Sequence, residues 1–131
     1  MAIAIDFSQE DLNRGKIISP AWYRVHIDDI TQALSKNGDS TNYLVKGTIA
    51  KNADTGDVEF AGFPTPYWNF NSKAKGFMIG FFAALGFDPQ AGTRYDLEAM
   101  KGKDLEVMIE NELYEGRMIN RINHKYRKVS K

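Results

Sequence analysis

Apolar and polar residues alternate in several short segments of this chain, and alternation of this kind predicts half-buried strands. In residues 22–30, Tyr23, Val25 and Ile27 alternate with polar or charged neighbours, so these three side chains should point inward. By the same reasoning, further strands are expected at residues 41–49, 58–63, 104–111 and 117–127. Gly47, in the middle of the second strand, suggests a sharp bend of the kind found at a barrel corner.

One segment, residues 73–85, has the pattern of a helix that is apolar nearly all round, and such a helix is expected to be buried. Its large apolar side chains are Phe77, Met78, Phe81, Phe82 and Leu85. Asn71 or Ser72 can cap its first amides, and Gly86 stands where a left-handed residue commonly ends a helix. A single helical turn is also expected at residues 96–101.

The order of these elements is three antiparallel strands, one helix and two more strands. It is the order of the OB-fold, a five-stranded Greek-key barrel whose helix lies between strands three and four. The expected fold is therefore mostly β, with an irregular N-terminal arm at residues 1–19 and the OB-fold domain at residues 20–131. A five-stranded sheet that packs on one helix without closing is the alternative.

Length and composition narrow the class of protein. A chain of 131 residues fits one domain with a sizeable core, and its lack of cysteine suits a reducing compartment. The apolar run at residues 1–5 ends at Asp6, too early for a signal peptide, and no stretch is long enough to cross a membrane. We therefore expect a cytoplasmic protein that does not associate with membranes.

The net charge is zero, with seventeen basic and seventeen acidic residues, but the charges are segregated along the chain. The last fifteen residues carry six basic residues and no acidic one, whereas residues 96–115 carry seven acidic residues and two lysines. If the last two strands pair with Glu112 opposite Arg117, cross-strand ion pairs would neutralise much of this basic segment. Arg127, Lys128 and Lys131 would remain free in either case.

Five of the sixteen aromatic residues lie just before the predicted helix: Phe60, Phe63, Tyr67, Trp68 and Phe70. Pro64 and Pro66 exclude a central strand there, so the segment should be an ordered loop. Its rings could simply seal the core, or some could lie in solvent as binding groups. Phe70, just ahead of the helix cap, is expected to point inward, so Tyr67 and Trp68 are the candidates for exposure. Trp22 is expected on the outer face of the first strand.

The chain has few signs of catalysis. His26 and His124 lie on different strands, and there is no glycine-rich phosphate loop, nucleophile elbow or HExxH motif. The acidic residues of the fourth strand alternate as solvated residues would; they are Asp104, Glu106, Glu110 and Glu112. We therefore expect no enzyme activity, cofactor or metal, and keep a small metal-dependent nuclease that uses these carboxylates as a second alternative.

Four stretches of the sequence resemble small phage-type single-stranded-DNA-binding proteins. They are AWYRVHI at residues 21–27, YLVKGTI at 43–49, the apolar segment 77–87 and LEAMKGK at 97–103. The resemblance extends over roughly residues 20–127 and implies an OB-fold that protects single strands in viral replication or recombination, in the host cytoplasm. Other replication or recombination proteins would then be partners. The basic end of this chain, however, argues against recruitment through an acidic tail.

Together these features predict a protein that binds single-stranded DNA with little sequence preference. Basic residues would contact phosphates and aromatic rings would stack on bases. The expected phosphate contacts are Arg24, Lys46, Lys73, Lys75, Arg121, Lys125 and Arg127, and the expected stacking rings are Trp22, Tyr67 and Trp68. Lys73 and Lys75 could also form an anion site with the first helix amides. The first alternative is a structural or assembly protein whose aromatic loop is a protein interface; self-association is compatible with either.

Overall fold

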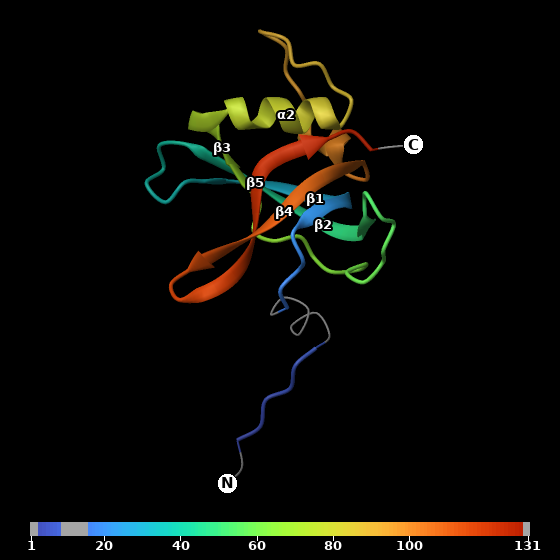
Figure 1. The fold of residues 1–131 in the computed structure, drawn as a ribbon. Helices are drawn as coiled ribbons and strands as arrows, with labels where there is room; N and C mark the ends of the chain where they lie inside the picture. The colour runs from blue at the N-terminus through green and yellow to red at the C-terminus, as the bar shows by residue number, and fades with distance from the viewer. Residues whose placement is uncertain (1–2, 9–15, 130–131) are drawn as a thin grey trace.

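The computed structural model describes residues 3–8 and 16–129, which include five strands in one antiparallel sheet of order β3-β2-β1-β4-β5 (Figure 1). The strands are β1 (Ala21–Leu34), β2 (Thr41–Asn52), β3 (Asn69–Asn71), β4 (Asp104–Tyr114) and β5 (Arg117–Arg127). Between β3 and β4 lie the 3₁₀ turn η1 (Ser72–Ala74), the helix α2 (Gly76–Ala84) and the 3₁₀ turn η2 (Leu97–Met100). The mostly β class and the helix between strands three and four are thus confirmed.

β1 is the central strand, and it bends. It pairs with β2 along most of its length and with β4 through its first half, and its register shifts between Arg24 and Val25 and again between Ile27 and Asp29. Bulges of this kind increase the local twist and bend a strand. Gly47 of β2 lies opposite Ile27 at the second shift. A Cβ atom there would be 2.8 Å from Val25 Cγ1, so the close approach of the two strands requires glycine.

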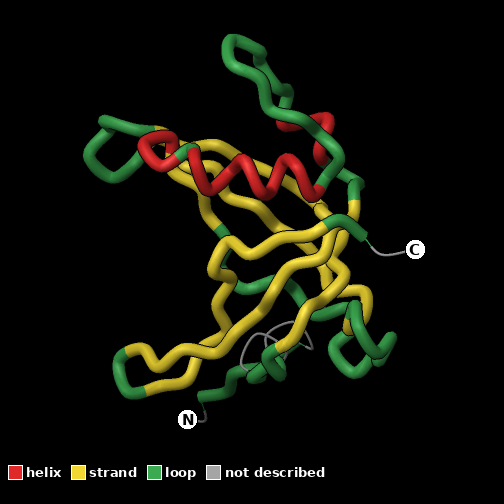
Figure 2. Tube along the Cα trace, turned by 45° about the horizontal axis from the view of Figure 1, so that its top comes forward, coloured by secondary structure: helices red, strands yellow, loops and turns green. Residues whose placement is uncertain are grey.

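The sheet curls until its two edge strands face each other, and α2 lies across the open end (Figure 2). No backbone ladder joins β3 to β5 in the part of the chain that the structure describes, so the barrel-like sheet is not closed. Side chains bridge the edges instead. The Phe70 ring lies 5.0 Å from the His124 ring and 6.1 Å from the Tyr126 ring, measured between centroids.

The core fills the inside of this curl. The inward residues predicted for the first strand, Tyr23, Val25 and Ile27, are all buried, which confirms the period-two interpretation. Phe81 and Phe82 enter the core from α2. The prediction that the helix is buried all round is wrong on one side, where Phe77 and Ile79 are exposed, because α2 covers the end of the sheet with one face only.

The third strand is not where the sequence predicts it. Residues 58–63 form turns, with hydrogen bonds from Ala61 N to Val58 O and from Phe63 N to Phe60 O, and Gly62 has a φ of 85°. The apolar run serves mainly packing, and only its end contacts β2, where Gly62 N donates to Ile49 O at 2.8 Å and Ile49 N donates to Phe63 O at 2.9 Å. The Phe60 ring lies 6.1 Å from the Tyr23 ring and 5.4 Å from the Phe63 ring.

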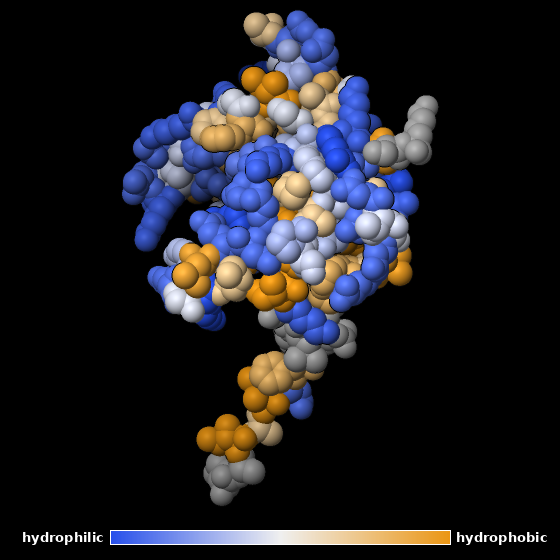
Figure 3. All heavy atoms as spheres, viewed as in Figure 1, coloured by the Kyte–Doolittle hydropathy of each residue, from blue (hydrophilic) through white to orange (hydrophobic). Residues whose placement is uncertain are grey.

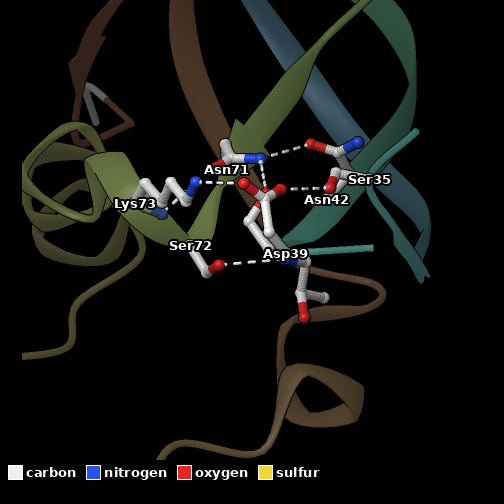
Figure 4. A network of polar contacts seen from close by, with 8 residues as sticks. Ser35, Asp39, Asn42, Asn71, Ser72 and Lys73 are labelled. Atoms are coloured by element: carbon white, nitrogen blue, oxygen red, sulfur yellow. Dashed lines mark hydrogen bonds and ion pairs between the residues drawn. The ribbon is translucent and has the colours of Figure 1, made fainter. Parts of the chain in front are cut away.

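β3 itself is short and polar at both ends, and side-chain hydrogen bonds extend its attachment to β2 (Figure 4). Asn71 Nδ2 donates to Asn42 Oδ1 at 2.9 Å, and the Thr41 amide donates to Ser72 Oγ at 2.9 Å. Asn71 Oδ1 also accepts from the Lys73 amide, as the capping prediction requires.

The other helix boundaries are close to prediction. The α-helical part is shorter than residues 73–85, because its first turn is the 3₁₀ turn η1. Gly86 has a φ of 93°, which confirms the left-handed position after the helix. The predicted turn at residues 96–101 is present as η2. In the described part of the chain, no helix has the length and apolar character needed to cross a membrane.

Candidate nucleic-acid interface

A groove of about 1180 Å³ runs over the outer face of β2. Its floor is formed by Leu44, Lys46 and Thr48, which alternate with the buried residues of the same strand. One wall is the proline-containing segment 64–67, and the other is the start of β5 together with residues 16–18. Asp28 and Asp29 of β1 also line the groove, which therefore joins five separate segments of the sequence.

The proline-containing wall is fastened to β2 by backbone contacts. Thr65 N donates to Gly47 O at 3.0 Å, and Val45 N donates to the carbonyl of Trp68 at 2.9 Å. These bonds hold the segment extended beside β2, so that successive side chains point to opposite sides. Tyr67 points outward with 73% of its surface exposed, whereas Trp68 is buried in the core at 1%.

The charges of the groove leave it cationic. Lys46 and Arg117 are exposed, and neither makes an ion pair with a residue that the structure describes. Of the two acidic residues that line the groove, Asp29 is paired with Lys101 at 2.9 Å. That hydrogen bond is the main reason why the pKa of Asp29 lies below its usual value. The second, Asp28, accepts a hydrogen bond from the Thr48 hydroxyl at 2.6 Å.

The opposite wall depends on one amide side chain. Asn120 Oδ1 accepts from the Ile18 amide at 2.9 Å, and Asn120 Nδ2 donates to the Lys16 carbonyl at 3.0 Å. The Asn120 side chain thus pairs with residues 16–18 as a neighbouring strand would. It brings Lys16 to the groove, where its Nζ lies 5.7 Å from the centre of the Phe63 ring.

Of the ten residues predicted to bind DNA, only Lys46, Tyr67 and Trp68 line this groove, and Trp68 does so from within the core. The expectation that the Trp68 ring is exposed is therefore wrong. Its indole Nε1 donates to the Tyr126 hydroxyl instead. Sequence reasoning missed Lys16 and Arg117 as members of the site. Arg117 belongs to the basic segment and could have been included, but nothing in the sequence indicates the contact through Asn120.

A second group of predicted residues lies on the outer face of β1, β4 and β5, where they form ion pairs with carboxylates. Arg24 pairs with Asp104 at 2.9 Å, and His26 Nδ1 lies 2.7 Å from the same carboxylate. Arg127 pairs with Asp54 and Glu106, so the expectation that it remains free is wrong. Its guanidinium carbon also lies 4.4 Å from the centre of the Trp22 ring, which is half-buried.

The remaining strand cations are also paired. Arg121 forms an ion pair with Glu112 at 2.6 Å and Lys125 forms one with Glu110 at 3.0 Å, so cross-strand ion pairs neutralise part of the basic segment. The predicted register is wrong, however. Arg117 faces Tyr114 and Arg121 faces Glu110, and the register shifts again between Val107 and Ile109. Lys128 is exposed, and Lys131 lies outside the described residues.

The two lysines before α2 do not form the expected anion site. Lys73 pairs with Asp39 at 2.5 Å, and its amide is bonded to Asn71. Lys75 lines a separate hollow of about 910 Å³, together with Arg94 and Tyr95. Neither Lys73 nor Lys75 lines the groove in which Lys46 lies.

The acidic residues of β4 offer little to a metal-dependent nuclease, because ion pairs occupy all four: Asp104, Glu106, Glu110 and Glu112. Within residues 3–8 and 16–129, no three histidine or acidic residues are placed to hold a metal ion together. Comparison with known proteins adds no assignment: no protein-family model matches the chain, and no curated protein matches it.

Proposed function

We propose that this protein is a non-enzymatic, OB-fold protein that binds single-stranded DNA with little sequence preference, through the groove over β2. The observation that carries the proposal is the arrangement of three exposed groups: the cations Lys46 and Arg117, which make no ion pair with a described residue, and the Tyr67 ring. Cations beside an exposed ring suit a ligand that presents phosphates and unpaired bases.

The OB-fold assignment is supported by the order of elements. The sheet curls, the helix between β3 and β4 covers its open end, and the two edge strands face each other, as in a small Greek-key barrel. Only the backbone pairing that would close the barrel is absent from the described residues.

The chemistry of the groove explains both the preference for single strands and the lack of sequence preference. Stacking on an aromatic ring contributes about 1–3 kcal/mol per base and requires the base to be free of its partner strand. Every base has a π face, so a single tyrosine does not distinguish bases. Lysine and arginine neutralise phosphates, which are the same in every sequence.

The proposal is tested by titrating labelled oligo-dT and a duplex of equal length with the protein and three variants. Lys46→Ala and Tyr67→Ala should each weaken oligo-dT binding, by about 1–3 kcal/mol for the ring. Lys125→Ala is the matched control, because this lysine is already paired with Glu110 and should not change the affinity. Equal affinity for duplex and single strand, or an equal loss in all three variants, would contradict the proposal.

A role as an assembly protein that uses Tyr67 as a protein contact rests on the same exposed ring. The two functions differ in one result. If Tyr67→Ala leaves oligo-dT binding unchanged but lowers self-association in sedimentation, the ring belongs to a protein interface. The roles in replication or recombination are proposed together with DNA binding and depend on it.

A further inference from the structure

The N-terminal arm presents a row of apolar side chains to solvent. Ile3, Ile5 and Phe7 are 97%, 76% and 64% exposed, and they alternate with Ala4, Asp6 and Ser8 in an extended segment. Figure 3 shows this row as orange spheres on the arm that projects from the body. Alternation at a period of two gives a strand one apolar face, and here that face lies in water.

The far end of the β4–β5 hairpin, residues 110–121, lacks a neighbouring strand along its β4 edge. β4 pairs with β1 only as far as Ile109, so residues 110–114 have a strand neighbour on the β5 side alone. Leu113 and Met118 face each other across this hairpin end and are 68% and 50% exposed. A two-stranded ribbon is marginally stable in water, and an open edge is a template for a further strand.

We propose that residues 3–8 of one copy of this chain add as a third strand along residues 110–114 of a second copy, and that the exchange is reciprocal. The six residues of the arm match the five of the open β4 edge in length. Its apolar face would cover Leu113 and Met118, and main-chain hydrogen bonds would use the free edge.

Charge supports the same pairing. Asp6 is the only charged residue among residues 3–8, and Arg117 lies within the hairpin end. Neither makes an ion pair with another residue that the structure describes. A second copy would supply the partner for both, so that the dimer and the DNA would compete for Arg117.

The arrangement of the arm favours a second copy over the chain's own hairpin. Residues 3–8 extend away from the body, so that they can reach another molecule as they stand (Figure 1). Two copies related by a two-fold axis would fill both open edges with both arms, which gives a closed dimer.

The first test is sedimentation velocity of the full chain over a range of concentrations, without DNA. The chain should form a dimer, and Ile5→Ser combined with Phe7→Ser should raise the dimer dissociation constant by about tenfold or more, as should Leu113→Ser combined with Met118→Ser. All four side chains are exposed, so circular dichroism should show unchanged folding. Val58→Ser, at another exposed apolar residue, is the control and should leave the dimer intact. A chain that stays monomeric, or a control that dissociates equally, overturns the inference.

The second test uses the absence of cysteine from the sequence. A chain with Ile5→Cys is mixed with a separate chain with Leu113→Cys and oxidised, and the linked peptides are identified by mass spectrometry. A disulfide between the two chains supports the exchange. A third chain carries both Ile5→Cys and Leu113→Cys. If a disulfide forms only in this chain, and joins its own two cysteines, the arm binds its own hairpin and the exchange is refuted.

Charge exchange gives the third test. Asp6→Arg and Arg117→Asp should each weaken the dimer about threefold or more, and the two together should restore it. Failure of the double variant to recover, with both single variants weakened, contradicts the proposed pairing. These measurements contain no nucleic acid, so their outcome is independent of whether the groove binds DNA.

Discussion

The indole Nε1 of Trp68 donates a hydrogen bond of 2.7 Å to the hydroxyl of Tyr126, across the gap between the two edges of the sheet. The two rings are stacked, with centroids 5.8 Å apart. Where a closed barrel has a ladder of backbone hydrogen bonds, residues 16–129 of this structure have this polar side-chain contact within a cluster of rings. The contact fixes Trp68 inside the core and leaves Tyr67, its neighbour in sequence, in the groove.

Removing the acceptor of this bond should destabilise the fold. Tyr126→Phe keeps the ring but leaves the Trp68 N–H buried without the Tyr126 oxygen, which should cost about 1–3 kcal/mol of unfolding free energy. Urea unfolding at neutral pH measures the change. Tyr114→Phe, on an exposed tyrosine, is the control and should stay within about 0.5 kcal/mol of the parent chain. Equal effects of the two substitutions would show that the contact across the gap contributes nothing.

Burial of His124, which lies beside the same hydroxyl, makes stability depend on pH. Because Tyr126 accepts from Trp68, its own proton is available to His124 Nδ1, which lies 2.9 Å away and must be unprotonated to accept it. Burial lowers the pKa of His124 in the folded protein. The unfolded chain therefore binds a proton first, and stability should fall as the pH drops below about 6.5, the ordinary value for histidine, until the lower folded pKa is passed.

Urea midpoints at pH 7.5 and pH 5.5 test this dependence. The pKa of Asp29, Asp39 and Asp104 is lowered by their partners, so the stability that these carboxylates add is lost only at more acidic pH. His124→Asn removes the titrating ring while tolerating the left-handed φ of 58° at this position. The variant should lose most of the difference between the two midpoints. If the difference is unchanged, His124 is not its source.

Two glycine substitutions should have opposite effects on stability. Gly47→Ala places a Cβ 2.8 Å from Val25 Cγ1 and 2.9 Å from the His26 carbonyl oxygen, and should cost about 1–3 kcal/mol, as overpacking of a core commonly does. Gly76→Ala meets nothing within 4 Å at the start of α2, so it should stabilise the helix by about 0.5–1 kcal/mol. Thermal or urea unfolding of both variants checks the prediction. A loss at both positions would contradict it.

The sequence predicts the order of elements well because alternation and helical periodicity are local properties. It misplaces the third strand because the apolar residues 58–63 form turns, of which only the end bonds to Ile49 of β2, and their Phe60 ring packs on Tyr23. The three residues of β3 have too little pattern to be recognised, and their pairing with β2 is a tertiary contact.

The candidate site was predicted in part. A lysine and an exposed tyrosine could be expected from residue type, and Lys46 and Tyr67 both line the groove. Which carboxylates the other cations pair with depends on the β4–β5 register, and this register shifts between Val107 and Ile109. The choice between Tyr67 and Trp68 depends on tertiary contacts: backbone bonds to β2 hold the segment extended, and the bond to the Tyr126 hydroxyl fixes the Trp68 ring in the core.

The most direct measurement of the central claim is the salt dependence of oligo-dT affinity. Each phosphate neutralised on a single strand lowers the slope of log K against log salt concentration by about 0.7. Contacts from Lys16, Lys46 and Arg117 therefore predict a slope of about −2. Lys46→Ala should reduce the steepness of this slope by about 0.7, and Lys125→Ala should leave it unchanged. A slope near zero, or one that Lys125→Ala changes and Lys46→Ala does not, would contradict binding in this groove.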